Sequence, residues 1–129
     1  MEHWSDRYIN QPYVPGSGDC AALAEKVAVE HLALSPGLPG SHAAGLREQA
    51  GQIAALKMDF AVKVPQPIEG HPVLLISRGD LFHIGVMCRL ANEWWVLHAD
   101  KGFGAVIRQP LRKMTMVDYK VEGFYKWKS

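Results

Sequence analysis

The chain is built around the sequence Pro15-Gly16-Ser17-Gly18-Asp19-Cys20-Ala21-Ala22-Leu23, a glycine-rich turn that leads into apolar residues at helical spacing. The two glycines permit a tight turn, and Asp19 is a residue type preferred at helix N-caps, so the predicted helix begins at or beside Cys20. Unpaired N–H groups and the positive end of the helix dipole favour a thiolate at this position. The same N–H groups could hold a developing oxyanion.

One face of the predicted helix is apolar. Its members recur at helical spacing and are Cys20, Leu23, Ala24, Val27, Ala28 and His31. Glu25, Lys26 and Glu30 fall on the other side, so we expect Cys20 to point toward the body of the protein. A buried structural cysteine is the alternative interpretation of this position.

Length and composition predict a single domain over residues 1–129. The chain is 48% hydrophobic, and its 14 basic and 13 acidic residues give a formal charge of +1. This balance argues against nucleic acid or a membrane surface as a partner. Two cysteines are too few for a disulfide scaffold, so we expect Cys20 and Cys88 to be free thiols. The N-terminus shows no signal-peptide pattern, and we expect a protein made in the cytoplasm.

Helical patterns precede strand patterns along the chain. A breaker segment at residues 35–41 ends the first helix, and apolar spacing predicts a second helix between Ser41 and Ala54. Alternation then predicts an antiparallel sheet, with strands over residues 72–77, 82–90, 94–99, 105–109 and 121–127. We therefore expect an α+β fold in which helices pack on one face of an antiparallel meander.

Two of the six histidines occupy neighbouring positions in the predicted sheet. His83 lies near the start of one strand and His98 near the end of the next, so an antiparallel hairpin brings them together. Alternation points Cys88 away from His83, which leaves Cys20 as the better nucleophile. Cys20, His83 and His98 could supply a thiolate, a base and a group that orients the base.

Two other interpretations of the histidines remain open. Histidines on strands often serve only to satisfy hydrogen bonds in a core. A zinc site could use His71, His83, His98 and one cysteine, but their spacing matches no compact ligand motif. We expect no metal and no cofactor.

The order of these motifs resembles that of the NlpC/P60 cysteine peptidases, which hydrolyse bacterial cell-wall peptides. The similar segments are Tyr13 with Asp19-Cys20, His83-Ile84-Gly85-Val86 and Val96-Leu97-His98-Ala99. The resemblance implies a papain-like fold in which a helix bearing the cysteine packs on an antiparallel sheet. It also implies that Cys20 is the nucleophile, His83 the general base and His98 its orienting residue. Tyr13 and Asp19 would line the substrate site.

The resemblance also bears on substrate and setting. It implies hydrolysis of peptidoglycan stem peptides. Residues 4–9 and 123–127 look like the compact versions found among phage tail proteins, so other tail proteins are expected partners. The family usually has Ser-Gly after the cysteine, whereas this chain has Ala21-Ala22. Ala21 cannot hold a substrate amine as that serine does. A catalytically silent component of a phage tail is therefore the alternative function.

Overall fold

The computed structural model describes residues 3–14, 20–36, 60–77, 81–100, 102–117 and 119–128. The second predicted helix, from Ser41 to Ala54, lies outside these residues, as does Asp19. The elements in chain order are η1 (Trp4–Tyr8), α1 (Cys20–Glu30), β1 (Ala61–Val64), β2 (Pro72–Ser77), β3 (Leu81–Leu90), β4 (Glu93–Asp100), β5 (Ala105–Pro110), η3 (Leu111–Val117) and β6 (Lys120–Trp127).

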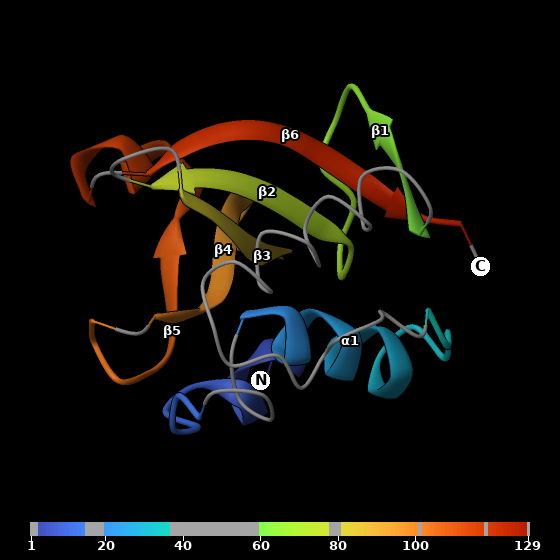
Figure 1. Ribbon diagram of the computed structural model, residues 1–129, viewed down its shortest axis with the longest axis horizontal. Coiled ribbons are helices and arrows are strands. Elements are labelled where there is room, and N and C mark those ends of the chain that lie inside the picture. The colour runs from blue at the N-terminus through green and yellow to red at the C-terminus, as the bar shows by residue number, and fades with distance from the viewer. Residues whose placement is uncertain are drawn as a thin grey trace.

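The strands form one antiparallel sheet with the order β1-β6-β2-β3-β4-β5. Strands β2 to β5 follow one another as a meander, whereas β6 returns to lie between β1 and β2 (Figure 1). The turn between β3 and β4 has positive φ at both Ala91 and Asn92, as in the type I′ turns that match the twist of a hairpin. This turn sets the register Leu90↔Glu93 to Val86↔Leu97.

An apolar core lies between α1 and one face of the sheet. Figure 1 shows α1 alongside the sheet, next to β3 and β4. The predicted apolar face of the helix is confirmed from Cys20 to Ala28, because its five members within α1 are buried. His31 follows the end of the helix and is exposed instead, where it stacks on Trp4 with ring centroids 4.1 Å apart.

A second, smaller core covers the opposite face of the sheet. Its buried members are Val73, Leu75, Met87, Val96 and Met114, the last of which comes from η3. Tyr119 packs against this cluster just before β6 begins. α1 therefore packs on one face of the sheet, and η3 and Tyr119 pack on the other.

The N-terminal segment protects the edge strand β5. Asn10 donates its N–H to the carbonyl of Val106 at 2.9 Å, and Val106 donates in return to Gln11 at 2.8 Å. The N–H of Tyr13 then bonds to the carbonyl of Gly104 at 2.9 Å. These bonds occupy backbone groups that an edge strand otherwise leaves open, and they hold Tyr13 beside the turn that joins β4 to β5.

The expected α+β papain-like fold is wrong. The described residues form mainly a six-stranded antiparallel sheet, with a single α-helix of 11 residues. The strand pattern is nearly continuous from residue 61 onward, and this part contributes most of the described chain. Sequence patterning missed β1, which has only four residues and pairs with the distant β6. Within the described residues, no helix combines the length and apolar character needed to cross a membrane.

Candidate functional site

His83 and His98 form a hydrogen-bonded pair, as predicted from the hairpin. His83 lies near the start of β3 and His98 near the end of β4, just past the last pair of their ladder, Val86↔Leu97. The Nε2 atom of His83 is 2.9 Å from Nδ1 of His98. The rings meet edge to face, with centroids 5.0 Å apart and planes at 85°. The pair therefore holds one imidazole in a fixed orientation against another.

Two further residues complete this cluster, and sequence reasoning missed both. Oε1 of Gln109 on β5 lies 2.8 Å from Nε2 of His98, which extends the hydrogen-bonded chain to a third strand. Tyr119 stacks on His83 with centroids 5.1 Å apart and planes at 22°. Gln109 lies in the predicted strand over residues 105–109 and could have been found by pairing that strand with the one that carries His98. No local pattern marks Tyr119.

Burial controls the ionisation of this cluster. His98 is fully buried, and burial lowers its pKa below the ordinary value. Burial, with a smaller contribution from His98, lowers the pKa of His83 to about 3. Burial is also the main reason why the pKa of Tyr119 rises to about 12. Near neutral pH, both imidazoles are therefore uncharged and Tyr119 keeps its proton.

Cys20 approaches this cluster from the other side of the sheet. It begins α1, is 6% exposed and belongs to the core beneath α1. His83 shares its face of β3 with Met87, which belongs to the opposite core. The ring of Tyr119 stacks on His83, and the ionised form of Cys20 is one of the smaller causes of the raised pKa of Tyr119.

Tyr13 lies in the same region as Cys20. Its half-buried side chain packs against the core that contains Cys20, and its ionised form is a minor cause of the raised pKa of Tyr119. Tyr119 therefore contacts both histidine rings, at centroid distances of 5.1 Å for His83 and 5.4 Å for His98, and lies within electrostatic range of Cys20 and Tyr13.

Cys88 is a core thiol, and the prediction that it points away from His83 is confirmed. It is fully buried in the cluster beneath α1, and its Sγ lies 3.7 Å from the carbonyl of Trp95, to which it donates. Burial raises the pKa of Cys88 to about 12. A thiol in this environment is inert.

The zinc alternative gains no support from the described ranges. They contain no group of three or more His, Cys, Asp or Glu residues arranged to hold a metal ion. His71 faces the end of β6, where its Nδ1 accepts a hydrogen bond of 3.2 Å from the backbone N–H of Trp127.

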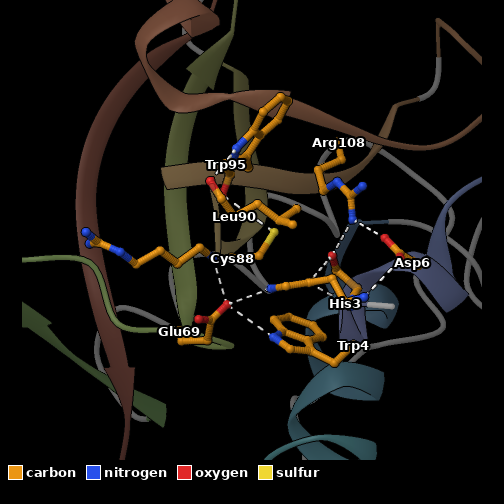
Figure 2. Close-up of polar contacts among 10 residues, drawn as sticks. His3, Trp4, Asp6, Glu69, Cys88, Leu90, Trp95 and Arg108 are labelled. Atoms are coloured by element: carbon orange, nitrogen blue, oxygen red, sulfur yellow. Dashed lines mark hydrogen bonds and ion pairs between the residues drawn. The ribbon is translucent and has the colours of Figure 1, made fainter. Parts of the chain in front are cut away.

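A second polar cluster surrounds η1 (Figure 2). His3 caps η1, and its Nδ1 lies 2.7 Å from the hydroxyl of Ser5 and 3.1 Å from the N–H of the same residue. Arg108 donates to the Ser5 hydroxyl at 2.7 Å and to the Asp6 carboxylate at 2.6 Å. Glu69 accepts from the indole of Trp4 at 3.1 Å. These contacts fasten η1 to the body of the protein.

Three residues of this cluster have the residue types and the connectivity of a catalytic triad, but they cannot act as one. Ser5, His3 and Glu69 are linked in that sequence, with His3 Nε2 3.5 Å from Glu69. Ser5, however, is fully buried and already accepts from Arg108, so a substrate has no access to its hydroxyl. A cleft of about 470 Å³ lies next to the cluster, lined by His3, Trp4, Asp6 and Arg7. It contains none of the residues around Tyr119.

Comparison of the chain with protein-family models, curated proteins and solved structures finds no match. The function must therefore be argued from the residues of the site.

Proposed function

We propose that the protein is a cysteine hydrolase in which Cys20 is the nucleophile, His83 the general base and His98 the residue that orients His83. The observation that supports this assignment is the hydrogen-bonded chain from His83 through His98 to Gln109. A neutral imidazole whose second nitrogen is held by a polar partner is oriented to accept a proton.

The proposed reaction uses groups at the start of α1. His83 takes the proton of Cys20, and the thiolate attacks the carbonyl carbon of an amide. Backbone N–H groups in the first turn of α1 stabilise the oxyanion. His83 then returns its proton to the leaving amine, and water, activated by the same imidazole, releases the acyl group from sulfur.

The proposed substrate is the stem peptide of bacterial peptidoglycan, and the proposed setting is a phage or prophage tail. Both rest on the order of the Cys20, His83 and His98 motifs, which resembles that of the NlpC/P60 peptidases. A tail-associated protein would reach the cell wall from outside the cell, so it would need no signal peptide.

A silent structural component of a tail is the second candidate, and the surroundings of Cys20 favour it. The thiol is 6% exposed and lies beneath the sheet, on the face opposite to His83. Its neighbour Ala21 is 1% exposed and offers no polar side chain. In this alternative, Cys20 is a core residue and the histidine chain only satisfies buried polar groups.

Mass spectrometry of peptidoglycan and isolated stem peptides, before and after incubation with the protein, separates the two candidates. Wild-type protein and Cys88→Ala should cleave a defined amide bond, whereas Cys20→Ala should not. Cys88→Ala is the matched control, because it removes a buried thiol from the same core. Circular dichroism establishes that each variant is folded. Intact peptides after incubation with folded wild-type protein would refute the hydrolase and favour the silent tail component.

A further inference from the structure

The side-chain amide of Gln109 determines which ring nitrogens donate and which accept in the hydrogen-bonded chain from His83 through His98 to Gln109. Gln109 lies on β5 opposite Val96 of β4 and is half-buried. Its oxygen Oε1 faces Nε2 of His98 at 2.8 Å. A carbonyl oxygen can only accept a hydrogen bond, so Nε2 of His98 must carry the proton.

This one assignment fixes both histidine rings. His98 is neutral, so with a proton on Nε2 its Nδ1 has a free lone pair. That Nδ1 lies 2.9 Å from Nε2 of His83, which must therefore donate. Nδ1 of His83 is then left without a proton and can accept one.

If the hydrogen bonds ran in the opposite direction, His83 could not act as a base. With the amide nitrogen of Gln109 toward His98, Nε2 of His98 would accept and its Nδ1 would carry the proton. His83 would then accept at Nε2 and hold its own proton on Nδ1. In that arrangement Nδ1 of His83 is a donor and cannot take a proton from a thiol.

We propose that Gln109 is a positioning residue that sets the tautomers of His98 and His83 and so keeps Nδ1 of His83 free as a proton acceptor. The role of that acceptor toward Cys20 rests on the proposed function. The tautomers themselves do not, because they follow from the orientation of the Gln109 amide and the hydrogen bonds between the rings. Gln109 acts through the two histidines.

Two-bond ¹H–¹⁵N correlation spectra of the histidine rings in the intact protein, at neutral pH, test this role directly. Gln109→Met keeps the side-chain length but removes the acceptor. Gln109→Glu supplies a carboxylate, which can only accept. Gln11→Met is the matched control, since the amide of Gln11 bonds to Arg7 and Lys26.

Wild type, Gln11→Met and Gln109→Glu should show both rings protonated at Nε2. One hydrogen bond of ordinary strength biases the two directions by about tenfold, so in Gln109→Met the fraction of His98 protonated at Nδ1 should rise from about a tenth to about half. Protonation of His98 at Nδ1 in the wild type would overturn the inference. So would a Gln109→Met spectrum in which both rings keep the wild-type tautomers.

Alkylation of Cys20 by iodoacetamide separates this inference from the proposed function. If both are correct, Gln109→Met reacts about twofold more slowly than wild type, because the fraction with Nδ1 of His83 free falls from about nine tenths to about half. Gln109→Glu reacts at nearly the wild-type rate. Equal rates in all three proteins, together with the expected tautomers, would refute the catalytic role of Cys20 but leave the positioning role of Gln109 in place. Unexpected tautomers would refute the positioning role whatever the rates.

Discussion

Substitution of Gly85 by alanine tests how tightly the sheet is packed beside the histidine pair. Gly85 lies on β3 between His83 and Met87, on the same face as both. A Cβ at this position would lie 2.6 Å from Cγ1 of Val96 and 3.1 Å from Cγ1 of Val73. Carbon atoms normally approach to about 3.5–4.0 Å, so the first contact is about 1 Å too short.

The size of the effect follows from the rigidity of the surroundings. Val73 and Val96 are both fully buried in the second core, so neither can swing toward solvent to make room. Overpacking of this kind costs about 1–3 kcal/mol. For a domain of this length, a loss of about 2 kcal/mol lowers Tm by about 8 °C.

The assay is urea unfolding followed by tryptophan fluorescence, with a double-mutant cycle. Val96→Ala removes the methyl group that the new Cβ would meet, so Gly85→Ala should cost less in that background by about 1 kcal/mol or more. Gly102→Ala is the control, because its Cβ would have only Asp100 Oδ1 near it, at 3.4 Å in an exposed turn. A Gly85→Ala protein as stable as wild type, or strictly additive effects in the cycle, would refute the packing argument.

Two further predictions concern ionisation and the cluster around η1. Because the pKa of His83 is about 3 in the folded protein against an ordinary 6.5, the unfolded chain binds this proton more readily between those values. The free energy of unfolding should therefore fall as the pH drops below 6.5, by up to about 1.4 kcal/mol per pH unit from this residue, and His83→Gln should flatten the slope of urea midpoints between about pH 7 and about pH 5. An unchanged slope would contradict the buried, neutral imidazole. Arg108→Met leaves the buried Ser5 hydroxyl without its charged donor and should lower the free energy of unfolding by about 1–3 kcal/mol. Arg7→Met removes only an exposed ion pair and should leave stability nearly unchanged. Equal urea midpoints for the two variants would contradict a stabilising role for the Arg108–Ser5 hydrogen bond.

Features set by local chemistry were predictable from the sequence. The glycines and Asp19 in the sequence predicted a helix that begins at or beside Cys20, where α1 does begin, and period-two alternation located five of the six strands of the described residues. The short connection at Ala91-Asn92 forces the two flanking strands to pair in a definite register. That register brings His83 and His98 together.

Features that depend on distant parts of the chain were not predictable. β1 and β6 pair through residues such as Ala61 and Trp127. The alternation of apolar residues in either segment does not indicate which strand it pairs with. The same holds for Arg108 and Ser5, which meet across more than a hundred residues. The position of Tyr119 over His83 likewise depends on how the chain returns after η3. Sequence patterns likewise could not predict on which face of the sheet Cys20 lies, because this depends on how distant segments pack.

The position of β6 between β1 and β2 has a consequence for the order in which the protein can assemble during synthesis. Strands β2 to β5 are joined by local connections, so they can pair as soon as the ribosome has released them. β1 emerges before any of them, yet its partner β6 follows all the other strands of the described residues. Until β6 has been synthesised, β1 has no partner strand, and the edge of β2 that β6 will occupy stays open to other strands. The final residues of the described chain therefore complete two strand pairings at once, and a nascent chain that stalls before Lys120 would present an unpaired sheet edge to chaperones or to its neighbours.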